Sequence, residues 1–334
     1  MNGIKKTRKR ILSGIQPSGT IHIGNYFGAI ENWVRLLDEY ECFFTIVDLH
    51  AITIPYEPEL MPKRVWEAAL DNIAAGLDPA RCTLFVQSQV PEHTELCWLL
   101  NAVTPLGELS RMTQFKEKSE QQKENVTAGL LNYPILQAAD ILIYLADAVP
   151  VGEDQAQHLE FTREVARRFN GRFGDYFPEP QTLLGRVARV IGLDGASKMS
   201  KSLGNHIGVT EEPEVIWEKL RPAKTDEARK RRSDPGEPDR CTIFSYHQLV
   251  GLPDELQEVA RGCRAAGIGC LDCKRIFFLN LMKVLDPIRE RRKDLEKRPD
   301  YIRESMTQGA ARARAVAQET VRGAKERMGL VSPF

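Results

Sequence analysis

The sequence lacks the segments that would send a chain to a membrane or out of the cell. It has no run of about 18 apolar residues, because two aspartates interrupt the most apolar stretch, 138–151. The basic start, 1–10, is followed only by the apolar segment 11–15 before a polar turn, which is too short for the core of a signal peptide. We therefore expect a cytoplasmic protein that does not associate with a membrane.

Net charge, internal repeats and low-complexity tracts are also absent. The 334 residues contain 46 Lys and Arg against 46 Asp and Glu, with 42% hydrophobic and 28% charged residues. This composition excludes a disordered, collagen-like or coiled-coil chain. Zero net charge also argues against a general polyanion binder. It leaves room for a local basic face, because residues 274–334 hold 15 Lys and Arg against 8 Asp and Glu.

Cysteine is scarce and odd in number, with seven in the chain. In a reducing compartment we expect thiols or metal ligands rather than a disulfide framework. Four of them, Cys241, Cys263, Cys270 and Cys273, follow the pattern C-x21-C-x6-C-x2-C. Four thiolates suffice for a tetrahedral zinc ion or a [4Fe–4S] cluster, and the spacing decides only weakly between these and unligated thiols.

The first part of the chain alternates strand and helix patterns. Apolar runs predict strands at 11–15, 42–49 and 82–87, and helical periodicity predicts helices at 24–39 and 58–76. Strands that are apolar on both faces and alternate with helices indicate a parallel sheet in an α/β domain. Ligands of such sheets bind beyond the carboxyl ends of the strands.

The remainder of the chain is mostly helical. Its patterns predict helices at 92–103, 128–146, 154–170, 211–221, 253–263, 274–297 and 299–328. The segment 224–240, with two prolines and a run of four basic residues, predicts an exposed connection. The length and the change of pattern predict two domains, 1–205 and 206–334, with the C-terminal helix able to pack back on the first.

The turn after the first strand suits a nucleotide. Gln16-Pro17-Ser18-Gly19 leads to His22-Ile23-Gly24-Asn25, where a helix begins. Small residues let a nucleotide approach the backbone, a helix start offers N–H groups and a positive dipole to phosphate, and His22 can donate to a phosphoryl oxygen. The alternative is an ordinary strand–helix turn with a surface histidine.

A second candidate is the basic segment Lys198-Met199-Ser200-Lys201-Ser202. Two lysines three residues apart can form a mobile clamp that neutralises a leaving pyrophosphate. The alternative is a solvated basic loop.

The predicted helix from residue 128 carries a polar stripe. Tyr133, Gln137, Asp140 and Tyr144 are spaced 4, 3 and 4 residues apart, so they share one face among Ile, Leu and Ala. A carboxylate in apolar surroundings is costly unless it is paired, so Asp140 needs a donor. The alternative is an aspartate that caps a helix or pairs within the core.

Together these motifs resemble a known family. His22-Ile23-Gly24-Asn25 after the first strand, with Lys198-Met199-Ser200-Lys201-Ser202 about 175 residues later, resembles the signatures of class I aminoacyl-tRNA synthetases. The segments 47–53, 112–119, 133–144 and 151–155 are similar to tryptophanyl-tRNA synthetases. This resemblance is collinear from residue 11 to about residue 330.

The resemblance implies a fold and an activity. The fold would be a Rossmann-like catalytic domain over 1–205 and a helical anticodon-binding domain over 206–334. The activity would be the activation of tryptophan by Mg-ATP to tryptophanyl-adenylate, followed by transfer of tryptophan to the 3′ adenosine of tRNA(Trp). The family also leads us to expect a homodimer. One alternative is a tyrosyl-tRNA synthetase, since Asp140 could also accept a hydrogen bond from a phenol. The other is a non-catalytic RNA-binding paralogue.

The resemblance further implies three sets of site residues. The catalytic set is His22, Asn25, Lys198 and Lys201. Tryptophan would be bound by Gln16, His50, Tyr133, Asp140 and Gln155, with the indole N–H donating to Asp140. ATP would be bound by Gln16, Pro17, Ser18, Gly24, Asn25, Lys116, Gly152, Glu153, Asp154, Val190, Lys198, Met199, Ser200, Lys201 and Ser202. A glycine followed by acceptors at 152–154 suits the ribose hydroxyls, and an acidic helix cap is the alternative for Glu153.

The resemblance also concerns the cysteines and the basic C-terminal part. The segments around Cys241, Cys263, Cys270 and Cys273 resemble the subset of tryptophanyl-tRNA synthetases with a [4Fe–4S] cluster in the anticodon-binding domain, where it would hold helices together. The basic surplus after residue 274, with 229–232, is the candidate tRNA surface, and exposed helix charge is the alternative.

Overall fold

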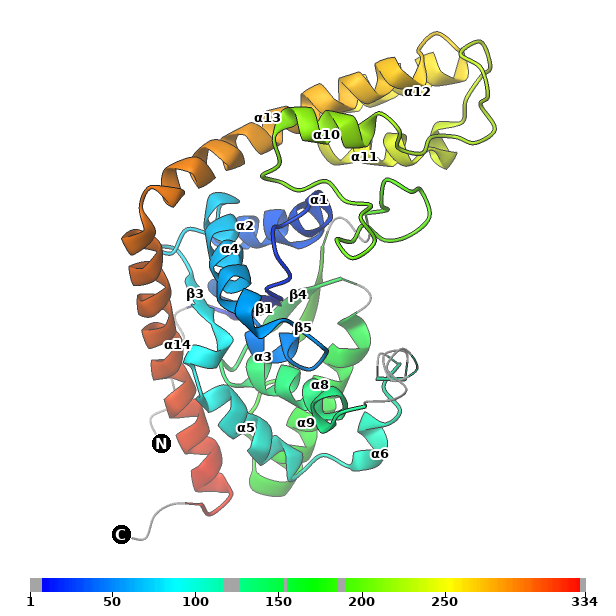
Figure 1. Ribbon diagram of the computed structural model, residues 1–334. Helices are drawn as coiled ribbons and strands as arrows, with labels where there is room; N and C mark the ends of the chain where they lie inside the picture. The colour runs from blue at the N-terminus through cyan, green and yellow to red at the C-terminus, as the bar shows by residue number, and fades with distance from the viewer. Residues whose placement is uncertain are drawn as a thin grey trace.

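The computed structural model describes residues 8–113, 115–116, 120, 126–152, 155–185 and 190–330 (Figure 1). It contains one sheet of five parallel strands in the order β3-β2-β1-β4-β5. The strands are Arg10–Ile15 (β1), Glu41–Ile46 (β2), Thr83–Val86 (β3), Ala148–Val151 (β4) and Gln181–Leu184 (β5). The predicted α/β class with a parallel sheet is therefore confirmed.

The first three strands were predicted from their apolar runs and the last two were not. Residues on β1 to β3 alternate between two cores: Ile11 and Leu84 pack into one, whereas Leu12 and Phe85 pack into the other. Burial of both faces explains their continuous apolar sequence. The strands β4 and β5 are four residues long, and β5 has no buried residue, so neither carries a strong pattern.

Helices cover both faces of the sheet. One face packs against α4 (Met61–Ala74) and the segment formed by α1 (Ile23–Asn25), the π-helical turn η1 (Tyr26–Ile30) and α2 (Glu31–Leu36). The other face packs against α5 (Glu92–Asn101), α8 (Ala128–Leu142) and α9 (Ala156–Phe173). Short elements complete this part: α3 (Asp48–Ala51), η2 (Pro58–Leu60), η3 (Gln87–Gln89) and α6 (Leu106–Leu109).

Two predicted elements differ from the structure near the carboxyl ends of the strands. The strand predicted at 42–49 ends at Ile46, because Asp48 begins the short helix α3. The helix predicted at 24–39 ends at Leu36 and contains the π-helical turn η1. The helix α3 and the turn η1 contribute to the edge of the sheet where ligands bind, whereas Leu36 lies near the opposite end, just before β2.

The C-terminal part consists of helices that begin apart from the sheet and return to it. They are α10 (Pro213–Leu220), η5 (Pro238–Arg240), α11 (Thr242–Val250), α12 (Pro253–Arg264), α13 (Cys270–Glu296) and α14 (Pro299–Arg327). Figure 1 shows α13 leaving the group of α10 to α12 and passing over α4 to reach α14. The helix α11 and the short helical turn η5 were not predicted; the other four lie within a few residues of their predicted bounds.

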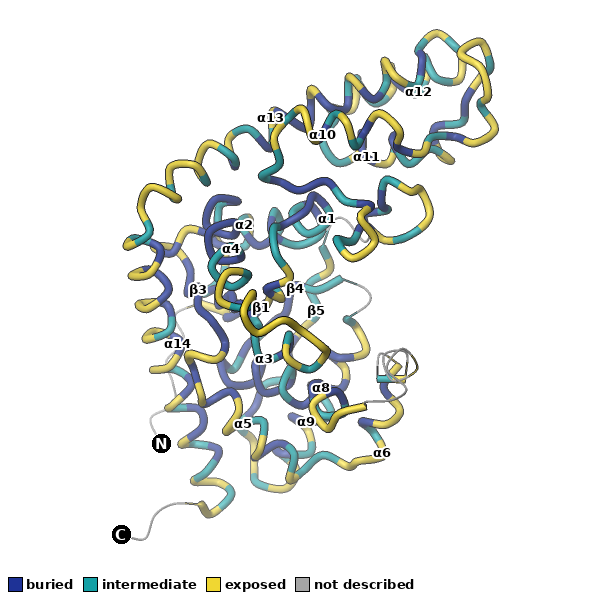
Figure 2. Tube along the Cα trace, viewed as in Figure 1, coloured by how far each residue is buried: buried dark blue, intermediate teal, exposed yellow. Residues whose placement is uncertain are grey.

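The last helix lies along the edge strand β3. It packs against β3 and α5, and its Ala313, Ala317 and Val321 join the second core. At Gly309 the helix approaches the backbone so closely that an added Cβ would overlap the carbonyl of Leu84. Figure 2 shows the alternation of buried and exposed residues along this helix. No helix among the described residues is both long and apolar enough to cross a membrane.

Candidate active site

A cavity of about 480 Å³ opens at the carboxyl ends of β1, β2 and β4. The strand order reverses between β1 and β4, which is where open α/β sheets bind ligands. Residues from the turn after β1, the segment after β2, the helix α8, the end of β4 and the segment 198–199 line it together. The motifs selected from the sequence therefore meet in one place, although Gln16 and Met199 are 183 residues apart in the chain.

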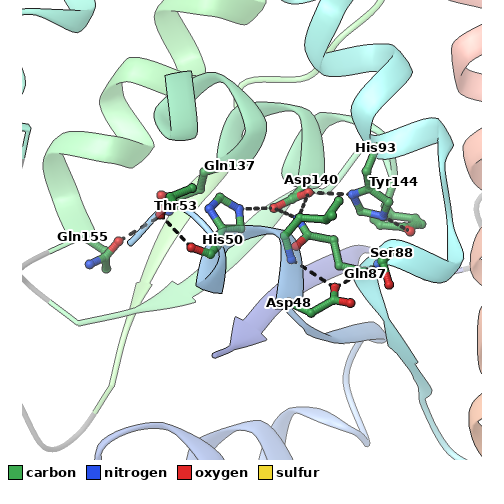
Figure 3. Close-up of polar contacts among 11 residues, drawn as sticks. Asp48, His50, Thr53, Gln87, Ser88, His93, Gln137, Asp140, Tyr144 and Gln155 are labelled. Atoms are coloured by element: carbon green, nitrogen blue, oxygen red, sulfur yellow. Dashed lines mark hydrogen bonds and ion pairs between the residues drawn. The ribbon is translucent and has the colours of Figure 1, made fainter. Parts of the chain in front are cut away.

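One end of the cavity is built around Asp140. Its side chain is almost fully buried and is held by three donors from three different segments (Figure 3). His50 Nε2 lies 2.8 Å from Oδ2, His93 Nδ1 lies 2.6 Å from Oδ1, and Gln87 Nε2 lies 2.7 and 2.9 Å from the two oxygens. Asp140 and His50 line the cavity, whereas Gln87 and His93 lie behind them.

This arrangement keeps the Asp140 carboxylate ionised and fixed. Burial by itself raises the pKa of a carboxyl group, but the hydrogen bonds and electrostatic interactions with His50 and His93 outweigh it and lower the pKa of Asp140 to about 2. His93 is oriented in turn by Tyr144, whose hydroxyl lies 2.7 Å from Nε2. The sequence correctly indicated that Asp140 needs a donor, and the structure provides three from the protein itself.

Sequence reasoning missed Gln87 and His93. Gln87 directly follows β3 and His93 lies in the first turn of α5. A usable signal existed, because polar residues just after a buried parallel strand gather at the ligand-binding edge. Which polar residue faces inward depends on the neighbouring helix, and that information is not local in the sequence.

Further polar side chains complete this end of the cavity. The hydroxyl of Tyr133 lies 2.9 Å from His158 Nε2, and the side-chain amide of Gln137 donates to Gln155 Oε1 at 3.4 Å. Tyr133, Gln137 and Gln155 all line the cavity. The predicted polar stripe thus divides: Tyr133 and Gln137 on α8 line the cavity with Asp140, whereas Tyr144, just beyond the end of α8, is fully buried and does not line it.

The other end of the cavity is the turn that begins α1. His22 is the N-cap residue: its Nδ1 accepts from the backbone N–H of Asn25 at 3.2 Å, and its own N–H donates to Asn25 Oδ1 at 3.2 Å. Gly24 is required here, because an added Cβ would lie 2.9 Å from the His22 ring. His22 is buried and lines the cavity, so the alternative of a surface histidine is wrong.

The charge state of His22 follows from this geometry. Burial, and then the positive charges of Lys201, His206 and Lys198, lower the pKa of His22 to about 4. The imidazole is therefore neutral at pH 7. Because Nδ1 accepts a hydrogen bond from Asn25, the ring proton is on Nε2, which makes His22 a neutral donor.

The segment 198–202 closes over the same end. Lys198 and Met199 line the cavity, and Lys201 Nζ donates to the carbonyl of Ser18 at 3.1 Å. Burial lowers the pKa of Lys201 to about 8; Glu67 opposes this shift and Arg64 adds to it. A lysine that is half buried against the turn after β1 does not belong to an ordinary solvated loop.

The fold holds the basic segment in shape through Asn205. Its side chain accepts from the N–H of Ser200 at 2.7 Å and donates to Asp194 Oδ2 at 2.8 Å and to the carbonyl of Lys198 at 3.2 Å. Gly192 is needed beside it, since an added Cβ would overlap the Asn205 side chain. Asn205 was not among the predicted site residues, although it closely follows the basic segment.

The remaining predicted residues divide into three groups. Gln16, Asn25, Gly152 and Val190 line the cavity with the residues already described. Outside the lining lie Pro17, Ser18, Lys116, Ser200, Lys201 and Ser202. Glu153 and Asp154 lie outside the residues that the structure describes.

The four predicted ligand cysteines come together in the C-terminal part. They lie at the start of α11 (Cys241), near the end of α12 (Cys263) and in the first turn of α13 (Cys270 and Cys273). Burial, and then the neighbouring thiols of the other three, raise the pKa of Cys273 to about 12. Four thiols in one region match by type the donor set of a group that takes four thiolates. Among the described residues, however, no three His, Cys, Asp or Glu side chains are arranged to hold a metal ion.

Comparison with known proteins identifies relatives along almost the whole chain. The family model described as tRNA synthetases class I (W and Y) matches residues 5–285. A tryptophan–tRNA ligase of Deinococcus radiodurans is 51% identical over 327 residues, which cover 96% of this chain and 99% of that protein. One of Caldanaerobacter subterraneus is 45% identical over 332 residues, with 97% and 99% covered.

A solved structure agrees with these relatives. Tryptophanyl-tRNA synthetase from Campylobacter jejuni, in a crystal structure complexed with ADP and tryptophan, matches with a TM-score of 0.85 at 33% identity, covering 96% of this chain and all of that one. The family model includes tryptophan and tyrosine enzymes, and the relatives decide for tryptophan over the tyrosyl alternative. The chain belongs to the class I tRNA synthetases and, within them, to the tryptophan–tRNA ligases.

Proposed function

We propose that the cavity holds tryptophan at its Asp140 end and ATP at its His22 end, so that the two react between them. The observation that carries this proposal is that Asp140, His22 and Lys198 line one cavity. Tryptophan–tRNA ligases join tryptophan to its tRNA through an adenylate, and one cavity with these two ends would hold tryptophan next to ATP. Magnesium would enter with ATP as part of the substrate.

Tryptophan recognition rests on the remaining acceptor capacity of Asp140. A carboxylate offers about four acceptor positions; His50 and His93 contact one oxygen each, and the single nitrogen of Gln87 is shared between both, at 2.7 and 2.9 Å. An indole N–H from the cavity side would take the position that Gln87 contacts at 2.9 Å, leaving Gln87 its shorter contact. Gln155, paired with Gln137, and Gln16 are then suited to the ammonium and carboxylate of the amino acid.

The first chemical step needs no protein nucleophile. A carboxylate oxygen of tryptophan attacks the α-phosphorus of ATP, the bond to the bridging oxygen of pyrophosphate breaks, and that oxygen keeps the electron pair. Catalysis is then positioning and stabilisation of charge. The neutral Nε2–H of His22 donates to a phosphoryl oxygen, and the ammonium groups of Lys198 and Lys201 neutralise the departing pyrophosphate.

The second step transfers the tryptophanyl group to tRNA. A ribose hydroxyl of the terminal adenosine attacks the acyl carbon, and AMP leaves with the electron pair of the broken acyl–phosphate bond. We assign the sheet-containing part, 1–205, to catalysis and the helical part, 206–334, to anticodon binding, with α14 packed on the former. The basic surplus after residue 274 and the segment 229–232 would contact the tRNA phosphates. A homodimer and a cytoplasmic location stay predictions.

We also propose that Cys241, Cys263, Cys270 and Cys273 hold a [4Fe–4S] cluster, on the ground of their spacing in the sequence and the chemistry of four thiols. The cluster would be structural when bound. Through the four cysteines, the starts of α11 and α13 and the end of α12 would be joined to one another.

Pyrophosphate exchange tests the catalytic part of the proposal. Lys198→Ala and Lys201→Ala should slow adenylate formation while tryptophan affinity changes little, because both lysines lie at the ATP end. A defect confined to tryptophan affinity would contradict the assignment. Parallel assays with tryptophan and tyrosine test the amino-acid site, because a site built around a buried acceptor strongly rejects a side chain that it does not fit.

A further inference from the structure

Another buried carboxylate, that of Asp71 on α4, lies outside the cavity and has no role in the steps above. Its side chain is fully buried within the first core. A buried charge persists only where it is paired and hydrogen-bonded. Asp71 has two partners from distant parts of the chain: the backbone N–H of Ile21 donates to Oδ2 at 3.0 Å, and the guanidinium of Arg292 on α13 contacts Oδ1.

The first partner places Asp71 directly behind the catalytic turn. Ile21 immediately precedes His22, the N-cap residue that lines the cavity. The N–H of Ile21 is bonded to Asp71, its carbonyl accepts from Val209, and the N–H of Ile23 donates to Ile207. The position of His22 is therefore set by α4 on one side and by the segment 207–209 on the other.

The second partner brings in the long helix α13. Arg292 is mostly buried and also contacts Glu296 on its own helix. The neighbouring Lys293 pairs with Glu212 at 3.1 Å in an exposed ion pair outside the segment 207–209. The contact of Arg292 with Asp71 therefore joins this end of α13 to the support of the turn, and the other end of α13 carries Cys270 and Cys273.

We propose that Asp71 is a positioning residue for adenylate formation, and that Arg292 fixes its carboxylate so that α13 sets the place of the turn His22 to Asn25. The proposal rests on the assigned role of that turn. Asp71 acts through the Ile21 N–H and touches no substrate. If the anchor is lost, His22 shifts relative to the α-phosphate, while the Asp140 end of the cavity is unaffected.

Two paired substitutions separate positioning from stability. Asp71→Asn with Arg292→Gln keeps an acceptor for Ile21 and lets the two amides bond each other. Asp71→Leu with Arg292→Met has similar volume and no acceptor. Replacing both members of a buried ion pair together avoids the unpaired charge that a single substitution would leave. Lys293→Gln, which removes an exposed ion pair on the same helix, is the matched control.

The expected result is a split between turnover and binding in pyrophosphate exchange. Asp71→Leu with Arg292→Met should lower kcat by about 10- to 100-fold, the size of effect that follows from misplacing a reacting group, with the KM for tryptophan nearly unchanged. Asp71→Asn with Arg292→Gln and Lys293→Gln should both stay close to the wild type. Equal kcat values for the two paired variants at similar melting temperatures would overturn the proposal.

A second measurement does not depend on the folding of the leucine variant. Hydrogen exchange followed by mass spectrometry should show faster exchange in peptides spanning Ile21 to Asn25 for Arg292→Gln, but not for Lys293→Gln. Unchanged exchange in these peptides would refute the coupling to α13. A wild-type enzyme that fails to form an adenylate would instead refute the proposed function, so the two failures are distinguishable.

Discussion

The low pKa of Lys201 leads to a prediction about the pH dependence of ATP activation. Burial lowers this pKa to about 8 in the free protein, so the ammonium is largely charged at pH 7 and loses its proton as the pH rises through 8. A neutral amine cannot neutralise the departing pyrophosphate. The kcat/KM for ATP in pyrophosphate exchange should therefore fall on the alkaline side.

The size of the fall follows from the titration. About nine-tenths of Lys201 is charged at pH 7 and about one-tenth at pH 9, so kcat/KM for ATP should fall about tenfold between them, since this ratio reports the pKa values of the free enzyme. The value of kcat should change less, because bound phosphate stabilises the ammonium and raises its pKa.

Lys201→Arg provides the matched variant. Arginine keeps its charge throughout this range. The variant can therefore differ from the wild type in absolute activity, but residue 201 no longer contributes to the fall of kcat/KM at alkaline pH. Titration of ATP, of tryptophan and of all other enzyme groups affects both proteins alike. The informative quantity is the ratio of wild-type to Lys201→Arg kcat/KM, measured at intervals from pH 6.5 to 9.5.

We expect a ratio that is constant below pH 7 and then declines, with a midpoint near pH 8. A ratio that stays constant to pH 9.5 would show that Lys201 is either fully charged or irrelevant to ATP.

Three further predictions concern separate parts of the molecule. Asp140→Asn should raise the KM for tryptophan by about 10- to 150-fold, because a hydrogen bond to a charged group contributes about 1.5–3 kcal/mol. Because the pKa of Asp140 is lowered to about 2, the ionised carboxylate stabilises the fold above about pH 4, and this stabilisation should be lost as the pH falls toward 2. Acid unfolding of the wild type and of Asp140→Asn measures this loss. Gly309→Ala should lower the free energy of unfolding by about 1–3 kcal/mol, as overpacking does, whereas Gly171→Ala on the exposed face of α9, where an added Cβ meets nothing, should not lower it; urea unfolding checks both. Protein purified without oxygen should contain about four iron and four sulfide per chain, and Cys241→Ser should reduce both; stoichiometric zinc without iron would contradict the cluster.

Local pattern was sufficient for the first three strands and for the motifs. Strands that bury both faces, such as β2 with Phe43 and Phe44 in opposite cores, need a continuous apolar run, and this run is visible in the sequence. The helix start at His22 is likewise encoded within four residues, because the capping box joins His22 to Asn25. The short strands β4 and β5 and the helix α11 were missed because they depend on neighbours rather than on their own periodicity.

The sequence by itself determined that Asp140 must be paired, that His22 begins a helix and that a basic segment follows. Only the tertiary structure decided the partners: Asp140 receives donors 47 to 90 residues away in the chain, and Arg292 reaches Asp71 across 221 residues. Hydrogen bonds and charge pairs depend on distance in space, and the order of the parallel strands sets which segments meet. The same applies to the pKa values of His22 and Lys201, because burial, which lowers both, exists only in the folded chain.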